Sequence, residues 1–384
     1  MTPTDILLTD ASDIYGGGEF FVLELARSLS GRAHRVHVSC RNDNLLAEKC
    51  RRAGIDVFPI AYPERGGLVR NISAIRKYIV ERQIAIVHSN NNYDRTASGA
   101  AARWAGARHV TSIHSFHSIQ HNLTHWARNR FATDHFLVDG FCVRDLLVNQ
   151  DHIPASEISV IHLGVDPAGM KRDPAARAKV RREFGFADDE LVVGNVGRLV
   201  PMKGQEYLVR AFADVARRVP SARLLLVGDG ELKGRLTALA EESGASGRIV
   251  FAGFRDDLTA VYSAFDVYAH SSIEGGGETF PFAVLQALAQ ELPAVVTNVG
   301  DVAQMVDEGV NGFVVADKDP ALLAAAMVKV LIEPSERQRM AEESYRRFKR
   351  DFTLEKMTDR VENVYSTALF PSAGTGFVCR LSTS

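Results

Sequence analysis

The stretch Glu278-Thr-Phe-Pro-Phe-Ala-Val-Leu-Gln-Ala-Leu-Ala-Gln-Glu-Leu-Pro293 joins a polar start to an apolar run of helix length. The pattern predicts a helix that opens near Glu278, ends before Pro293 and is followed by the strand-like run Ala294-Val-Val-Thr297. Gln286 would then lie about 12 Å from Glu278 along the helix axis. Two polar groups at that separation can hold different parts of one elongated ligand. The alternative is that Glu278 only caps the helix and Gln286 is solvated.

Apolar runs of strand length alternate with helix-length amphipathic segments along the chain. The runs that indicate strands are residues 5–9, 35–39, 57–60, 85–88, 109–113, 135–138, 158–161, 191–194, 222–227, 249–251, 267–269, 294–297 and 312–315. Segments such as 19–29, 207–218 and 321–331 read as the intervening helices. This alternation predicts an α/β fold with parallel sheets covered on both faces, and the two series of strands predict two Rossmann-like domains.

Composition limits the classes of protein that fit. A chain of 384 residues is too long for most single cores, so two domains are the natural expectation. A net charge of −2 gives no reason to expect a nucleic-acid partner. The four cysteines show no paired or metal-binding spacing, and neither a signal peptide nor a membrane-spanning run is evident. We therefore expect a cytoplasmic protein.

Further motifs extend the pattern upstream and downstream of Glu278. They are Val196-Gly-Arg-Leu-Val-Pro-Met-Lys-Gly204, Leu225-Leu-Val-Gly-Asp-Gly-Glu231, Val250-Phe-Ala-Gly-Phe254, and Asn298-Val-Gly-Asp301 with Gly309-Val-Asn-Gly-Phe313. In this order, over about residues 190–315, the chain resembles the family 4 retaining glycosyltransferases. The resemblance implies the GT-B fold, in which two Rossmann-like domains face each other across a cleft. The N-terminal half resembles the family more weakly.

The sequence departs from the family's Glu-x7-Glu element in two ways. The second acidic position is Gln286, and the residues before Glu278 are expanded to Glu274-Gly-Gly-Gly277. The insertion creates a competing register in which Glu274 is the site acid. We prefer Glu278, because Leu285-Gln-Ala-Leu-Ala289 then aligns with the family's Leu-Glu-Ala-Met-Ala without a gap.

The resemblance also implies the domain organisation. We expect an acceptor-binding domain over residues 1–166, with the motif His162-Leu-Gly-Val-Asp166 at its end, and a nucleotide-sugar-binding domain over residues 167–353. Residues 354–384 would form a helix that crosses back to the first domain, followed by a mobile tail from Pro371 to Ser384.

Two cations and two acidic-element positions are the main candidates for donor binding. The resemblance implies that Arg198 and Lys203 neutralise a diphosphate leaving group, a charge whose stabilisation speeds glycosyl transfer. It implies that Glu278 lies near the donor sugar or its phosphate, and that Gln286 meets the ribose hydroxyls. Free N–H groups at the predicted helix start offer a phosphate site. Because Pro281 lacks a donor, Thr279 and Phe280 would supply them.

Glycine-containing turns supply the remaining candidates. The resemblance places the nucleobase, expected to be uracil, at Gly253 and Phe254, and it makes Gly228 and Asp229 part of the donor site. The alternative for Asp229 is that it stabilises its turn. In the first domain, Gly17 and Gly18 belong to the turn Gly16-Gly-Gly-Glu19, which resembles the family turn that approaches the donor phosphate or acceptor.

His114 ends a predicted strand and resembles the family histidine that lies close to the transferred sugar. The alternatives are a polar surface or a metal site formed with His117, His121 and His125. No carboxylate or cysteine accompanies these histidines at metal-ligand spacing, so we expect no metal.

The resemblance as a whole implies a retaining hexosyltransferase that uses a nucleotide-diphosphate sugar, most simply a UDP-sugar, with no cofactor and no required metal. Its catalytic residues would be His114, Glu278, Arg198 and Lys203. The acceptor would be a hydroxyl of a glycan or lipid-linked glycan in cell-surface polysaccharide biosynthesis. The alternatives are a nucleotide-sugar epimerase of GT-B fold and a degenerate nucleotide-sugar-binding protein.

A basic segment is a candidate for peripheral contact with the inner face of the membrane. It holds Arg65, Arg70, Arg76 and Lys77, and an ordinary solvated helix is the alternative.

Overall fold

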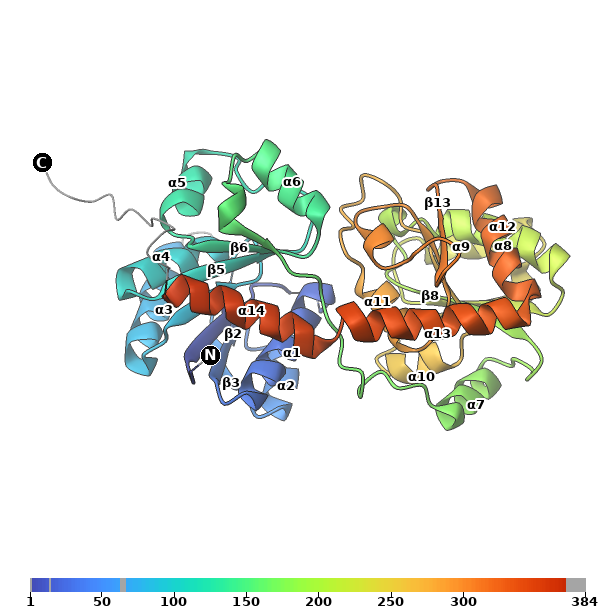
Figure 1. Ribbon diagram of the computed structural model, residues 1–384, viewed down its shortest axis with the longest axis horizontal. Coiled ribbons are helices and arrows are strands. Elements are labelled where there is room, and N and C mark those ends of the chain that lie inside the picture. The colour runs from blue at the N-terminus through green and yellow to red at the C-terminus, as the bar shows by residue number, and fades with distance from the viewer. Residues whose placement is uncertain (1, 14, 63–66, 371–384) are drawn as a thin grey trace, which may run out of the picture. The chain divides into compact units, whose positions relative to one another are not determined.

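The computed structural model describes residues 2–13, 15–62 and 67–370 (Figure 1). The expected mobile tail from Pro371 to Ser384 and the expected basic residue Arg65 lie outside these ranges. The described residues form two compact units, one from those up to His162 together with those from Leu354 onward, and one from Leu163–Thr353. The division therefore falls after His162, slightly before the expected boundary at residue 166.

The N-terminal unit contains a parallel seven-stranded sheet in the order β3-β2-β1-β4-β5-β6-β7. Its strands are β1 (Asp5–Thr9), β2 (Arg35–Cys40), β3 (Asp56–Pro59), β4 (Ile86–Ser89), β5 (Arg108–Ile113), β6 (His135–Val138) and β7 (Ile158–Val160). Its helices are α1 (Gly17–Gly31), α2 (Leu45–Arg52), α3 (Leu68–Arg82), α4 (Arg95–Ala105), α5 (Leu123–Phe131), α6 (Phe141–Asn149) and α14 (Leu354–Leu369).

The C-terminal unit contains a parallel six-stranded sheet in the order β10-β9-β8-β11-β12-β13. Its strands are β8 (Leu191–Val196), β9 (Ala222–Val227), β10 (Ile249–Gly253), β11 (Val267–His270), β12 (Ala294–Thr297) and β13 (Gly312–Val315). Its helices are α7 (Pro174–Glu183), α8 (Gln205–Arg218), α9 (Lys233–Glu242), α10 (Leu258–Ser263), α11 (Phe282–Ala289), α12 (Pro320–Ile332) and α13 (Pro334–Asp351).

Each strand predicted from the sequence has a counterpart whose ends lie within two residues of the prediction. The physical reason is that central strands such as β1, β4 and β12 are buried almost throughout, so they read as continuous apolar runs. Helices pack against these sheets, with α8 against α9 and α12 in one unit and α3 against α4 in the other (Figure 1). The expected α/β architecture of two Rossmann-like domains is confirmed.

The last helix, α14, belongs to the N-terminal unit and is fastened there by polar contacts. The Tyr365 hydroxyl and His88 Nδ1 share a hydrogen bond of 2.7 Å, and both side chains are buried. At the other end of the helix, Arg32 Nη1 donates to Asp359 Oδ1 over 2.6 Å. These contacts explain how residues that follow the C-terminal unit in sequence complete the N-terminal one.

The helix predicted to open near Glu278 begins later, at Phe282, so this prediction was wrong by one helical turn. Pro281 occupies the N-cap position, and because proline disfavours a helical conformation of the residue before it, the helix does not extend back toward Glu278. The preceding segment is held elsewhere, because the Thr279 carbonyl accepts a hydrogen bond from Asp301 N over 2.8 Å. Thr279 and Phe280 therefore lie before the helix, and its first turn begins with Phe282.

Glycine at position 194 is required by the core of the C-terminal unit. A Cβ there would lie 2.2 Å from the ring of Phe265, which is completely buried. We predict that Gly194→Ala destabilises the protein by about 1–3 kcal/mol, the usual consequence of overpacking. Gly234→Ala is the matched control, since nothing lies within 4 Å of that added Cβ and position 234 is helical. Alanine should stabilise α9 by up to about 1 kcal/mol. Urea denaturation in which both variants shift alike would contradict this prediction.

Candidate active site

The order of the C-terminal sheet reverses between β8 and β11, which are neighbours. Ligands of open α/β sheets bind beyond the carboxyl ends of strands at such a reversal. Lys203 lies in the short 3-10 turn Pro201–Lys203 after β8, and Glu278 lies in the segment that connects β11 to α11. The sheet topology thus places Lys203 and Glu278 beyond the carboxyl ends of the two strands at the reversal, where a ligand is expected.

Glu278 is the centre of a largely buried polar cluster. Its Oε2 forms an ion pair with Lys203 Nζ, accepts from Ser272 Oγ over 2.8 Å and lies 3.5 Å from His270 Nε2. The Glu278 side chain is only 11% exposed. Burial alone would raise its pKa, but Lys203 and His270 outweigh burial and hold the pKa of Glu278 well below its usual range. Glu278 is therefore a carboxylate across the physiological pH range.

The backbone around Lys203 is fastened to the segment after β11. Ser271 Oγ donates to the Lys203 carbonyl over 2.9 Å, and Ile273 N donates to the Met202 carbonyl over 3.0 Å. Gly204 has φ of 60°, and a Cβ there would lie 2.0 Å from the Ser271 carbonyl oxygen. The glycine of the Lys-Gly motif is thus needed for conformation and for close approach.

The residues around Glu278 are held by the closing motif of the sequence. A Cβ at Gly300, where φ is 60°, would lie 2.6 Å from the carbonyl oxygens of both Glu278 and Thr279. Thr279 and Phe280 are buried, and the Phe280 ring lies 5.6 Å from that of Phe352. Position 300 therefore accepts only a residue without a side chain, which lets the two segments touch.

Arg198 lies on a loop that rests on a glycine turn. A Cβ at Gly228 would lie 2.0 Å from the Gly197 carbonyl oxygen, so the backbones pack directly against each other. Buried Gln205 donates from Nε2 to the Arg198 carbonyl over 2.9 Å. The Arg198 side chain is exposed, and no ion pair within the described ranges involves it. Arg198 thus presents an uncompensated positive charge on a fixed backbone.

The expected nucleobase and turn residues lie close to one another in the fold. Gly228 N donates to the Gly253 carbonyl over 2.8 Å, which joins the turn after β9 to the end of β10. Asp229 is exposed, and its Oδ1 accepts from Gly230 N over 2.8 Å, so it also stabilises its own turn. The neighbouring Phe254 ring is 70% exposed and offers an apolar surface.

Gln286 lies inside α11 and is 7% exposed. Across the described part of the chain its amide has no protein hydrogen bond, whereas nearby Gln290 bonds Ser263 and Thr259. Gln290 is therefore structural. The Gln286 amide can still donate to and accept from hydroxyl groups. The separation of Glu278 and Gln286 does not follow the predicted helical geometry, because Glu278 precedes α11.

In the N-terminal unit, the turn after β1 leads directly into α1. Gly16 is extended, and its N–H donates to Glu19 Oε2 over 2.7 Å, which fixes the first turn of the helix. Gly17 and Gly18 are the first two residues of α1. A Cβ at Gly18 would lie 3.3 Å from Asn90 Nδ2, so a side chain would crowd the residue that follows β4.

Four polar side chains follow directly after four adjacent strands of this sheet and form a row. Asp10 follows β1, Asn90 follows β4, His114 follows β5 and Asp139 follows β6. Asn90 Nδ2 donates to Asp10 Oδ2 over 2.8 Å, His114 Nε2 bonds Asn90 Oδ1 over 2.8 Å, and His114 Nδ1 lies 3.5 Å from Asp139 Oδ2. We call these four residues the polar row.

Asp10 is the row member with the most perturbed titration. Burial and the nearby Glu19 carboxylate raise its pKa from 3.8 to about 6, although hydrogen bonds from Asn90 and Ser12 act in the opposite direction. Its protonated form is therefore populated closer to neutral pH than is usual for an aspartate.

The histidines after His114 do not form one helical face. His117 lies before α5, and only His125 belongs to that helix, 5.6 Å from the His121 ring between centroids. Within the described residues, no group of three or more histidine, cysteine, aspartate or glutamate side chains is arranged to hold a metal ion.

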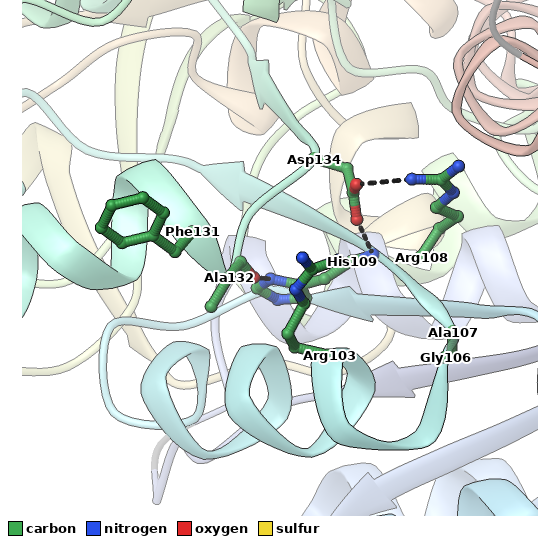
Figure 2. A pocket seen from close by; sticks show the side chains of 8 residues that line it. All are labelled: Arg103, Gly106, Ala107, Arg108, His109, Phe131, Ala132 and Asp134. Carbon is green, nitrogen blue, oxygen red and sulfur yellow. Dashed lines mark hydrogen bonds and ion pairs between the residues drawn. The ribbon is translucent and has the colours of Figure 1, made fainter. Parts of the chain in front are cut away.

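A pocket of about 250 Å³ lies at the amino ends of β5 and β6, opposite the strand ends that carry the polar row (Figure 2). Arg108 Nη1 donates to Asp134 Oδ1 over 3.1 Å, and Asp134 Oδ2 accepts from His109 N over 2.7 Å. The polar groups of this pocket thus form hydrogen bonds with one another. Ligands of open α/β sheets bind beyond the carboxyl ends of strands, so we do not place the nucleotide-sugar in this pocket.

Sequence reasoning missed several residues of these clusters. They are His270 and Ser272 around Glu278, and Asp10, Asn90 and Asp139 in the polar row. A usable signal was present for most of them, since the three row members each directly follow a strand and His270 ends one.

Comparisons with known proteins agree with this geometry. Residues 176–347 match the family described as Glycosyl transferases group 1, and residues 15–168 match Glycosyltransferase Family 4. The two matched regions are the C-terminal and N-terminal parts of a GT-B glycosyltransferase. The chain therefore belongs to glycosyltransferase family 4.

Two relatives illustrate the range of the family. An uncharacterised glycosyltransferase of Methanocaldococcus jannaschii is 30% identical over 220 residues, which span 56% of this chain and 55% of that protein. The GDP-mannose-dependent alpha-(1-6)-phosphatidylinositol monomannoside mannosyltransferase of Mycolicibacterium smegmatis is 30% identical over 273 residues, or 68% of this chain and 71% of that protein. The first match thus spans only about half of the relative's length.

Among solved structures, Anabaena HepE in complex with UDP superimposes with a TM-score of 0.83 at 23% identity, covering 95% of this chain and all of that one. This similarity supports the GT-B fold. Across the described ranges, no helix is both long and apolar enough to cross a membrane.

The two candidate registers of the site acid differ sharply in their surroundings. Glu278 is buried against Lys203, whereas Glu274 is exposed on a turn and is held only through its backbone N–H, which donates to Asp317 Oδ2 over 2.8 Å. We predict that Glu278→Gln lowers sugar transfer by about 10²-fold or more, the scale of one lost electrostatic contact in an active site. Glu274→Gln is the matched control and should stay within about twofold of the wild type, as surface changes usually do.

Initial rates and circular dichroism of both variants measure this difference. The opposite ranking of the two folded variants would move the site acid to Glu274.

Proposed function

We propose that this protein is a retaining glycosyltransferase that moves a sugar from a nucleotide-diphosphate sugar, most simply a UDP-sugar, to a hydroxyl group of a glycan or glycolipid acceptor. The observation that carries the proposal is the largely buried cluster of Lys203, Glu278, Ser272 and His270 at the strand-order reversal of the C-terminal sheet. Membership of family 4 gives this cluster its chemical context.

The leaving diphosphate needs positive charge, and two cations follow β8. Arg198 is exposed and has no ion-pair partner in the described part of the chain, while Lys203 is held by Glu278. In this proposal Arg198 and Lys203 bind the diphosphate and offset the charge that develops on it during transfer. Glu278 fixes the position of the Lys203 ammonium before the donor arrives, so little reorganisation is needed.

Further residues of the C-terminal unit complete the proposed nucleotide contacts. Gln286 would bind ribose hydroxyls through its amide, a weaker contact than a carboxylate makes. Gly253 and the exposed Phe254 ring would hold the base, and the turn at Gly228 and Asp229 would let the backbone approach the donor. Thr279 and Phe280 would shape the segment around Glu278, in place of the helix-start donors expected from the sequence.

Two donor bases have support. The UDP complex of Anabaena HepE, which shares the fold, favours uridine. The GDP-mannose dependence of the mycobacterial relative, which matches over more than two thirds of its length, favours guanosine as the second candidate. We retain UDP as the primary proposal, because backbone groups and one apolar ring suffice for a small pyrimidine.

In the N-terminal unit, we assign His114 to a contact with the transferred sugar and the turn at Gly17 and Gly18 to the donor phosphate or acceptor. Retention would follow if the acceptor hydroxyl attacks from the face that the diphosphate leaves, as in the family. The proposed mechanism uses no cofactor and no required metal.

The setting is proposed on family grounds. Relatives include a lipopolysaccharide core biosynthesis glycosyltransferase of Rhizobium meliloti, which favours a cell-surface polysaccharide or lipid-linked acceptor. Arg70, Arg76 and Lys77 are exposed on α3, as peripheral contact with an anionic inner leaflet would require. We propose a cytoplasmic protein that meets such a surface reversibly.

The earlier alternatives have less support. An epimerase has no acceptor substrate, so it would not need the polar row as a place for one. A degenerate binding protein would not need to keep the Lys203–Glu278 pair in addition to Arg198. The transferase relatives favour neither alternative.

We predict that only one nucleotide class gives a large thermal shift in a panel of UDP-, GDP-, ADP- and TDP-sugars, and that UDP-sugars give it. With that donor and an acceptor pool of glycans and lipid-linked glycans, the product should keep the anomeric configuration of the donor in proton NMR spectra. Lys203→Met, which keeps the length but removes the charge, should lower the rate by about 10²-fold or more.

Arg210→Met is the matched control, since Arg210 is an exposed cation of α8 away from the loops of the site. Donor epimerisation without acceptor, inversion of configuration, or full activity in Lys203→Met would each contradict the proposed function.

A further inference from the structure

Asn90 occupies the strand-order reversal of the N-terminal sheet, directly after β4 and beside β1. The side chain is 7% exposed, and the backbone N–H donates to the Thr9 carbonyl over 3.0 Å. Both the backbone and the side chain of Asn90 are therefore fixed at the position where the ligand of an open α/β sheet binds.

The hydrogen bonds of the Asn90 amide define its orientation. Nδ2 donates to Asp10 Oδ2 over 2.8 Å and to the Gly18 carbonyl over 3.1 Å, which uses both of its hydrogens. A rotation of the amide by half a turn would place Oδ1 against these two acceptors. Oδ1 must therefore face His114 Nε2, 2.8 Å away.

This orientation has a consequence for His114. Asn90 Oδ1 can only accept, so Nε2 of His114 carries a proton and donates. The ring is also packed against Phe21, with centroids 4.8 Å apart, and Nδ1 lies 3.5 Å from Asp139 Oδ2.

We propose that Asn90 is a positioning residue. It connects the turn of residues 16–18 to the imidazole of His114 through hydrogen bonds, and it holds that ring as an Nε2–H donor. One amide thereby sets both the backbone that approaches the donor or acceptor and the ring that meets the sugar. The inference rests on the proposed function for the role of His114, but not for its tautomer.

The coupling also explains the glycine at position 18. A Cβ there would lie 3.3 Å from Asn90 Nδ2, so a side chain would push on the amide and through it on His114. A turn that only approached a phosphate would not require this close contact with the residue after β4.

Two variants distinguish the hydrogen bonds that the Asn90 side chain donates from the one that it accepts. Asn90→Leu removes all three side-chain hydrogen bonds, whereas Asn90→Asp keeps an acceptor for His114 and loses both donors. Asn92→Leu is the matched control, because Asn92 Nδ2 contacts His117 Nε2 over 2.6 Å, outside the polar row.

The first readout is the tautomer of His114, measured by long-range proton–nitrogen NMR and assigned with His114→Gln. The wild type, Asn90→Asp and Asn92→Leu should show an Nε2–H ring, and Asn90→Leu should lose this preference. The second readout is kinetic. Asn90→Leu should lower kcat by about 10²-fold, the effect of misplacing a group in an active site. Asn90→Asp should weaken donor binding by about tenfold, the scale of one lost hydrogen bond to a charged group.

An unchanged His114 tautomer in folded Asn90→Leu would overturn the proposal, as would equal losses in Asn92→Leu. If circular dichroism shows that Asn90→Leu does not fold, the near-isosteric Asn90→Asp decides, and unchanged donor affinity in it would overturn the proposal. A wild type that transfers no sugar from any donor would refute the proposed function, while the tautomer measurement would still decide the role of Asn90.

Discussion

The ion pair between Lys203 and Glu278 is the interaction on which the C-terminal site depends. Burial alone would raise the pKa of Glu278, yet Lys203 and His270 keep this carboxyl group ionised. Removal of either partner would leave a largely buried charge uncompensated. Two glycines allow the close backbone packing around this ion pair. Gly204, next to Lys203, lies against the Ser271 carbonyl, and Gly300 lies against the carbonyls of Glu278 and Thr279.

The N-terminal unit uses the same topological rule with different chemistry. Its sheet also reverses order next to the first strand, and the residues that follow adjacent strands form the polar row. Here the tie is a neutral amide, Asn90, and the perturbed acid is Asp10, whose pKa is raised instead of lowered. One unit thus offers fixed charge, as a diphosphate needs, and the other offers directional hydrogen bonds, as hydroxyl groups need.

The sequence was sufficient for the strands, because buried parallel strands are continuous apolar runs. It also pointed to Lys203 and Glu278, which the fold brings into an ion pair. It was not sufficient for the start of α11, where Pro281 and the contact of Asp301 N with the Thr279 carbonyl shift the helix past Glu278. Position at or after a strand end was a usable signal for His270, Asn90 and Asp139, but the sequence did not show that they contact Glu278 or His114. Ser272 and Asn90 are ordinary polar residues in sequence, and only the lateral order of strands brings them into contact.

We propose that the loops after β8, β9, β10 and β11 form one nucleotide-diphosphate site around Lys203 and Glu278. Hydrogen–deuterium exchange of the intact protein, with and without saturating UDP, measures whether these loops bind the nucleotide together. We expect slower exchange with UDP in residues 197–205, 228–231, 253–255 and 271–286, and loss of this protection in Lys203→Met. Protection confined to other segments, or none with either UDP or GDP, would contradict this proposal.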